Sequence, residues 1–211
     1  MTRPSQWLLF DFGNVVSAFS YEPFIDFLAA SGGAAKLVVR KSFLGEDGLL
    51  NAYETGRIGT GRFLRRLRRE IAPGAKLPEM RTRFCGIFEH DYSALEAIRA
   101  VKPKFRIAVL SNTNPLHYRR TMRPLLSDLA DLFVASHRIG YRKPDPRFFA
   151  YFLGQAGATP ERCTFFDDLV PNVEAARAVG MEAHLVTATC PLAELMRSLD
   201  LIPSESGIMD P

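Results

Sequence analysis

Cysteine is scarce in this chain of 211 residues. The three cysteines, Cys85, Cys163 and Cys190, are an odd number, and no two of them stand in a CxxC spacing. A disulfide framework or a structural zinc site needs more cysteines at regular, closer spacing. We therefore expect neither, and we expect a protein that works in a reducing compartment.

Long apolar runs are also missing. No stretch comes near the roughly 18 apolar residues of a membrane-spanning helix. The apolar run at residues 7–10 stops at Asp11, which makes it too short for the core of a signal peptide. The sequence contains no internal repeat and no low-complexity tract. These absences predict a cytoplasmic protein that has no membrane partner.

The overall composition is that of a folded protein. Hydrophobic residues make up 47% and charged residues 24% of the chain, which fits one α/β domain or a core domain with a smaller insert. The net charge is +4 and the sequence pI is about 9.1. This surplus of positive charge modestly favours anionic ligands.

Continuous apolar runs, each followed by polar residues, mark the expected strands. The longest lie at residues 7–10, 105–110 and 163–166, and shorter ones lie at 132–135 and 183–186. Continuous rather than alternating apolar residues are typical of strands covered on both faces, as in a parallel sheet.

Helical patterns separate these runs in the second half of the chain. The apolar spacing predicts a helix over 92–101, and Pro171 and Gly180 predict one over 172–179. A third is expected to begin near Pro146. Strands and helices that alternate in this way predict an α/β fold with a doubly wound, mainly parallel sheet.

The segment 17–90 differs from the rest of the chain. It has no clear strand pattern and contains several amphipathic helical patterns interrupted by Gly and Pro. We therefore predict a core domain formed by residues 1–16 and 91–198, a helical cap domain at 17–90, and a tail at 199–211.

Polar side chains gather where the expected strands end. Asp11, Ser111 and the pair Asp167–Asp168 each come at the end of an apolar run. In an open parallel sheet, ligands bind beyond the carboxyl ends of the strands. Carboxylates crowded there raise one another's pKa unless a cation compensates them. Mg²⁺ is the natural candidate, because it prefers oxygen ligands and accepts a substrate phosphate.

Each of these residues has a simpler interpretation when taken alone. An Asp after a strand is often a turn or helix-cap residue, and Ser111–Asn112 could also cap a helix. Lys143 alone could be an exposed surface lysine. Taken together, however, the residues supply a nucleophile, metal ligands, an anion donor and a counter-charge.

Four strings resemble, in order, the motifs of the haloacid dehalogenase superfamily. They are LLFDFGNVV (8–16), VLSNT (109–113), GYRKPDP (140–146) and FFDDLVPNVEAARAVG (165–180). The residues of the first three strings, together with YETGRIG at 53–59, most resemble those of a bacterial subset that includes an α-D-glucose-1-phosphate phosphatase. The resemblance implies a Rossmann-like core with an inserted cap.

The same resemblance implies roles for the acidic residues. Asp11 is expected to attack phosphorus and form an aspartyl-phosphate. Mg²⁺ is expected to be held by Asp11, the backbone carbonyl of Gly13 and Asp167, with Asp168 as a further or water-mediated partner.

The remaining motif residues are expected to bind the phosphate. Ser111 would donate its hydroxyl to a phosphoryl oxygen, next to Asn112. Lys143 would pair with both the phosphate and Asp11. Asn172 could either steady the acidic loop or cap the helix that follows.

One position departs from the family pattern. Most phosphatases of this superfamily carry a second Asp two residues after the nucleophile, where it serves as general acid and base. This chain has Gly13 there, as does the subset that it resembles. The departure favours a substrate with a good leaving group, such as an anomeric sugar phosphate. Glu54 and His117 are candidates for the missing acid, although a structural role is the simpler interpretation of each.

A run of arginines lies within the expected cap. Residues 62–69 contain five arginines, while Phe63, Leu64 and Leu67 recur at helical spacing. We therefore expect a solvent-exposed helix face rather than a polyanion-binding site. The cap itself is expected to close over the phosphate site and to select the leaving group.

The leading hypothesis is a Mg²⁺-dependent phosphatase of a small phosphomonoester, such as a sugar phosphate. Its expected partner is a small phosphorylated metabolite, not nucleic acid, and the protein is expected to be a monomer or a weak homodimer. Two alternatives stay open. One is a metal-independent haloacid dehalogenase, which the acid pair at 167–168 disfavours. The other is a non-catalytic protein that binds a phosphorylated ligand.

Overall fold

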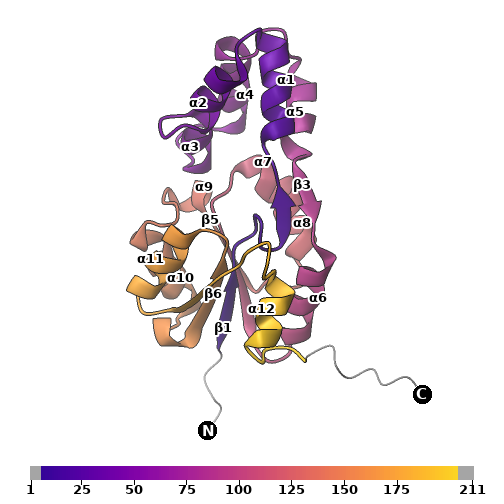
Figure 1. Ribbon diagram of the computed structural model, residues 1–211. Helices are drawn as coiled ribbons and strands as arrows, with labels where there is room; N and C mark the ends of the chain where they lie inside the picture. Colours follow the sequence, from indigo (N-terminus) through magenta and orange to yellow (C-terminus); the bar gives the residue numbers. More distant parts are fainter. Residues whose placement is uncertain (1–5, 204–211) are drawn as a thin grey trace, which may run out of the picture.

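A five-stranded parallel sheet forms the centre of the lower lobe in the computed structural model, which describes residues 6–203 (Figure 1). The strands lie in the order β5-β4-β1-β6-β7, and all the pairs are parallel. Their bounds are β1 Trp7–Phe10, β4 Arg106–Ser111, β5 Leu132–Ala135, β6 Cys163–Asp167 and β7 Glu182–Leu185. The chain runs outward on one side of β1 and then on the other, which confirms the predicted doubly wound sheet.

Alternate residues of each strand face opposite helical layers. Leu8 and Phe10 lie in one apolar cluster, and Trp7 and Leu9 lie in another. All four are at most 2% exposed. This burial on both faces explains why the strand sequences are continuously apolar.

Helices cover both faces of the sheet. The first cluster contains residues of α6 (Tyr92–Val101), α8 (Arg123–Leu126) and α12 (Leu192–Ser198). The second contains residues of α10 (Pro146–Ala156) and α11 (Val170–Ala178). Three helices predicted from the sequence are thus present, although α11 begins two residues earlier than expected. Short helical turns complete this lobe: α7 Pro115–His117, η1 Tyr118–Met122, α9 Ser136–Ile139 and η2 Pro160–Arg162.

The upper lobe is a group of helices with an apolar cluster of its own (Figure 1). Its helices are α1 Glu22–Gly32, α2 Lys36–Leu44, α3 Leu49–Glu54, α4 Thr60–Glu70 and α5 Leu77–Cys85. Aromatic rings dominate the centre of this lobe. Phe63, for example, stacks on Tyr53 with ring centroids 4.1 Å apart, and both rings are fully buried.

The upper lobe is joined to the sheet by a two-stranded antiparallel ribbon. Its strands are β2 (Ser17–Phe19) and β3 (Phe88–His90), and Ala18 pairs with Glu89. The expectation of no clear strand within 17–90 is therefore wrong. A strand of three residues is too short to show a periodic pattern, so only the pairing of the two crossing segments reveals it.

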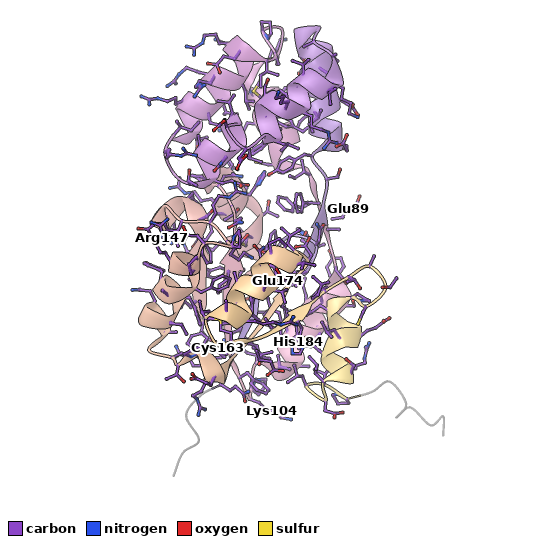
Figure 2. The ribbon with its side chains drawn as sticks, turned by 60° about the vertical axis from the view of Figure 1, so that its left-hand side comes forward. Glu89, Lys104, Arg147, Cys163, Glu174 and His184 are labelled. Carbon is purple, nitrogen blue, oxygen red and sulfur yellow. The ribbon has the colours of Figure 1, made fainter. Side chains whose placement is uncertain are left out.

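The strands run with their carboxyl ends toward the upper lobe. Lys104, just before β4, and Cys163, at the start of β6, lie at the bottom of the molecule, while Glu89 lies in the ribbon above (Figure 2). The carboxyl ends of β1, β4 and β6 are therefore directed toward the space between the lobes.

The end of the described chain packs against the core. Within the expected tail, Leu199, Leu201 and Ile202 contact the apolar cluster shared by α6 and α12. Residues 204–211 lie outside the described residues. Throughout residues 6–203, every helix is too short or too polar to pass through a bilayer.

Candidate active site

Three carboxylates meet at the carboxyl ends of β1 and β6. Asp11 directly follows β1, Asp167 ends β6, and Asp168 comes next. One oxygen of each lies within 4.8 Å of the others. The sheet causes this convergence, because β1 and β6 pair in parallel and the N–H of Asp11 donates to the carbonyl of Phe166 at 2.9 Å.

The ammonium group of Lys143 lies between two of these acids. Its Nζ lies 2.9 Å from Oδ1 of Asp11 and 2.6 Å from Oδ2 of Asp167, and its side chain has no exposed surface. Burial alone would lower the pKa of Lys143, but the two carboxylates outweigh burial and hold that pKa above its ordinary value. The two carboxylates therefore favour the charged form of Lys143 in the site.

Asn112 positions Lys143 through its backbone. The Asn112 amide donates to the Lys143 carbonyl at 2.8 Å, and its Oδ1 accepts from the Lys143 N–H at 2.8 Å. Both ends of the side-chain amide are thus used on the loop that carries the lysine.

The acidic loop is supported from both sides. Asn172 and the backbone N–H of Leu169 donate to Oδ1 of Asp167, each at 2.9 Å. Asn14 donates to Oδ2 of Asp168 at 2.9 Å. Of the two roles considered for Asn172, the structure shows the one that steadies the acidic loop.

Burial and the crowding of acids both raise pKa values in this cluster. Burial raises the pKa of Asp11 to about 7, with Lys143 opposing and Asp167 adding to the rise. Burial also raises the pKa of Asp168. When ionised, three carboxylates and one ammonium leave the cluster short of two positive charges, which is the charge of one divalent cation. The donor set, all oxygen atoms, suits Mg²⁺.

A cavity of about 300 Å³ opens above these acids, between the lobes. Ser111, the last residue of β4, lines it, as do Asp11, Gly13 and Asp168. The wall on the side of the ribbon and the upper lobe is mostly apolar. It is formed by Phe19, Tyr21, Leu44, Leu50 and Phe88.

Gly13 is enclosed by an aromatic ring. A Cβ added to Gly13 would lie 2.6 Å from Cε1 of Phe19, far closer than two carbon atoms can approach without a shift. Phe19 in turn packs against Tyr21 and Phe88, with ring centroids 5.5 and 5.9 Å apart. The space that a side chain at position 13 would occupy is therefore filled by the ribbon.

Glu54 reaches the cavity from the upper lobe. It is the last residue of α3, is 5% exposed, and lines the cavity together with Asp11. Its Oε2 lies 3.1 Å from a guanidinium nitrogen of Arg142 in the lower lobe. Burial raises the pKa of Glu54 to about 7, with Arg142 opposing and Asp11 adding to the rise.

His117, the other candidate acid, has a structural role. Its Nε2 lies 2.8 Å from the carbonyl of Phe84, and its Nδ1 lies 2.9 Å from the amide nitrogen of Asn114. A neutral ring that donates from Nε2 and accepts at Nδ1 satisfies both contacts. Burial lowers the pKa of His117 to about 4, so the ring is neutral at pH 7.

The arginine run lies on the outer face of α4. Phe63, Leu64 and Leu67 are buried, as their spacing predicted. Arg66 pairs with Glu70 at 3.0 Å. The residues that line the cavity above Asp11 include none from 62–69, so this basic face is separate from the acids.

Three residues of the site were missed from the sequence. Phe19 and Ser136 carry no motif, and only the fold places them next to Gly13 and Glu54. Arg142 did carry a signal, since it stands beside Lys143 in the string GYRKPDP.

Comparison with known proteins places these features in a family. A model of the haloacid dehalogenase-like hydrolases matches residues 9–180. A D-ribitol-5-phosphate phosphatase of Bacteroides thetaiotaomicron is 24% identical over 183 residues, which cover 83% of this chain and 88% of the relative.

A phosphatase of Mycobacterium tuberculosis is 34% identical over 131 residues. The match spans 59% of this chain and 59% of the relative's length. Among solved structures, a haloacid dehalogenase family enzyme of Bacteroides thetaiotaomicron, determined with magnesium and inorganic phosphate, superposes with a TM-score of 0.81. It is 21% identical, and the superposition covers 92% of this chain and 100% of that one. This likeness shows a shared fold.

Proposed function

This chain belongs to the haloacid dehalogenase-like hydrolases, and on that basis we propose that it is a Mg²⁺-dependent phosphatase of a small phosphomonoester. The reaction proceeds through an aspartyl-phosphate on Asp11. The observation that carries the proposal is the position of Lys143, whose ammonium contacts Asp11 and Asp167 beside a third carboxylate. The positive charge of Lys143 reduces the repulsion between the Asp11 carboxylate and the dianionic phosphate group that it attacks.

The residues divide the work of phosphoryl transfer. One carboxylate oxygen of Asp11 forms a bond to phosphorus while the bond to the leaving oxygen breaks. Lys143 favours the ionised nucleophile, and its charge stabilises negative charge on the phosphoryl oxygens. Ser111 offers a hydroxyl to the phosphoryl group.

Asp11, Asp167 and Asp168 would hold the cation, with the Gly13 carbonyl as a further ligand. When bound, Mg²⁺ offsets the repulsion between the nucleophile and the phosphate. Asn172, Asn14 and Asn112 keep the acids and the lysine in place through the hydrogen bonds described above.

The cavity supports a small substrate. Its volume of about 300 Å³ is at the lower end for pockets that hold small molecules, roughly 300 to 1,000 Å³. We propose a sugar phosphate as the first class to test. The apolar wall formed by Phe19, Leu44 and Leu50 also justifies testing esters of less polar alcohols.

The experiment is a phosphatase screen with Mg²⁺ over sugar phosphates, polyol phosphates, alkyl and aryl phosphates and nucleotides, together with 2-haloacids. We expect release of inorganic phosphate from at least one phosphomonoester and loss of that release after chelation. Halide release that survives chelation would instead support the dehalogenase. Binding of phosphate esters without any turnover would support the non-catalytic alternative, and either result would reject the proposal.

A further inference from the structure

The proposed reaction needs a group that both gives and takes a proton. When phosphorus is transferred to Asp11, the leaving oxygen of the alcohol must be protonated. When the aspartyl-phosphate is hydrolysed, the attacking water must lose a proton. Asp11 is occupied by phosphorus during both events, so the group must be another residue of the cavity.

Few side chains in the cavity can fill this role. The ionisable side chains that line it, among the described residues, are Asp11, Tyr21, Glu54, His117, Arg142 and Asp168. A guanidinium does not release its proton near neutral pH, and burial raises the already high pKa of the tyrosine. The histidine uses both ring nitrogens in the protein. Asp168 belongs to the cation cluster and accepts from Asn14. Glu54 remains.

The backbone holds Glu54 firmly over the lower lobe. The Glu54 carbonyl lies 2.6 Å from the hydroxyl of Ser136, which itself accepts from the N–H of Thr113 at 2.9 Å. Two residues later, Gly56 has φ of 70°, and a Cβ there would lie 2.4 Å from the carbonyl of His137. The end of α3 therefore lies against α9, which follows β5, and α9 is bonded in turn to the segment that follows β4.

The side chain of Glu54 lies among a small set of charges. Arg142 pairs with it from the lower lobe, Asp11 acts on it across the cavity, and the Tyr21 hydroxyl is close enough to feel its charge. The rise of the Glu54 pKa described above is the direction that an acid working near neutral pH requires. Arg142 opposes that rise.

We propose that Glu54 is the general acid and base of this enzyme, an inference that rests on the proposed phosphatase function. In the first step the Asp11–phosphorus bond forms and the ester bond breaks. The leaving oxygen keeps the electron pair and takes the proton of the Glu54 carboxylic acid. In the second step the Glu54 carboxylate takes a proton from water, whose oxygen bonds to phosphorus. Asp11 is released as a carboxylate, with inorganic phosphate as product.

The first test compares leaving groups of similar size. The substrates are p-nitrophenyl, phenyl and benzyl phosphate, whose leaving oxygens need increasing help from an acid. We expect Glu54→Gln to slow transfer from benzyl phosphate by about 10² to 10⁴, and transfer from p-nitrophenyl phosphate far less. Rapid-quench measurement of the first turnover separates transfer from hydrolysis.

The second test follows the aspartyl-phosphate itself. With p-nitrophenyl phosphate, Glu54→Gln is expected to release nearly one equivalent of p-nitrophenol rapidly and then to turn over slowly, because the base for hydrolysis is missing. Acid-stable labelling of the protein by p-nitrophenyl phosphate that carries a radioactive phosphoryl group should rise in the variant. Equal slowing of all three esters without accumulation of phosphoenzyme, or unchanged rates, would overturn the proposal.

Matched variants keep these outcomes distinct. Glu79→Gln removes a half-exposed cap glutamate that pairs with Arg83, and it should leave all rates unchanged. Arg142→Met removes the ion pair but keeps the acid. If the only role of Glu54 were to hold the two lobes together through Arg142, Arg142→Met and Glu54→Gln would lower the transfer rate by the same factor for every leaving group. Glu54→Asp keeps a carboxyl group, should recover part of the benzyl phosphate rate, and serves if the Gln variant does not fold. A wild type that forms no phosphoenzyme would instead reject the proposed function.

Discussion

At the scale of single residues, Asp11 shows how neighbours decide the chemistry of a carboxylate. Burial raises its pKa to about 7, and Asp167 adds to that effect. Lys143 acts in the opposite direction through a contact of 2.9 Å. A bound cation would lower the pKa of Asp11, as Lys143 does, and would so favour the ionised form of the proposed nucleophile.

Replacing Asp11 by Asn tests the nucleophile with little change in shape. Asp11→Asn removes the attacking oxygen anion but keeps the size of the side chain, and Asp167 still pairs with Lys143. We expect turnover of p-nitrophenyl phosphate to fall below detection while the circular dichroism spectrum and the thermal midpoint stay close to the wild type. Retained turnover would exclude Asp11 as the nucleophile.

Single residues also show where prediction from sequence ends. The position of Asp11 and Asp167 followed from one rule, that the carboxyl ends of parallel strands share an edge. The roles of Asn112 and Asn172 depend on which neighbour each amide meets, and spacing does not contain that information. Glu54 and His117 were equal candidates, and only their partners separate them: Glu54 pairs with Arg142, whereas both ring nitrogens of His117 are used in the protein.

At the scale of elements, the end of α3 is one of the places where the two lobes meet. The string YETG places Tyr53 in the upper core, Glu54 over the cavity and Gly56 against the lower lobe. A positive φ and a carbonyl in contact both require glycine at position 56. The string YETG therefore holds the upper lobe against the lower lobe, and it also places the Glu54 side chain over the cavity.

Substitution of Gly56 separates the effect of its contact with the lower lobe from the effect of its positive φ. We expect Gly56→Ala to lose about 1 to 2 kcal/mol of unfolding free energy from its positive φ and, in addition, to lose turnover, because the His137 carbonyl must move. Gly157 has φ of 58° and nothing within 4 Å of an added Cβ. Gly157→Ala should therefore lose stability alone. Urea unfolding and steady-state rates measure both; equal rates in the two variants would contradict the docking role.

The elements were predicted unevenly from the sequence. The strands of the sheet and the helix at 92–101 were found because buried elements leave continuous or periodic apolar patterns. The ribbon of β2 and β3 was missed, because its six residues are ordered by pairing between segments about 70 positions apart. The contact of Phe19 with Gly13 was missed for the same reason.

At the scale of the whole molecule, buried ionisable groups make stability depend on pH in opposing ways. The pKa of His117 falls from 6.5 to about 4 on folding, so the folded state resists protonation. Its contribution is complete above pH 6.5 and is lost as the pH falls toward 4. Asp11 and Glu54, whose pKa values rise on folding, change stability in the opposite sense as the pH falls.

A His117 variant separates the pH dependence of stability that comes from the histidine from the part that comes from the acids. His117→Gln keeps a donor and an acceptor but does not titrate, while Asp11 and Glu54 remain. Between pH 7 and pH 4 we expect the wild type to lose about 3 kcal/mol of unfolding free energy relative to the variant. This figure follows from the fall of the His117 pKa from 6.5 to about 4, at about 1.4 kcal/mol per pKa unit. Urea unfolding at several pH values measures this. A difference that does not vary with pH would show that His117 is protonated as readily in the folded protein as in the unfolded chain.

The ribbon makes the surroundings of Gly13 in the lower lobe depend on the position of the upper lobe. The ring that covers Gly13 belongs to β2, the first crossing into the upper lobe, and not to the sheet that carries the acids. A tilt of the upper lobe that bends β2 would carry this ring away and expose the backbone next to the nucleophile to water. In the proposed phosphatase, one displacement of Phe19 would then both admit water to Asp11 and open a way out for the alcohol.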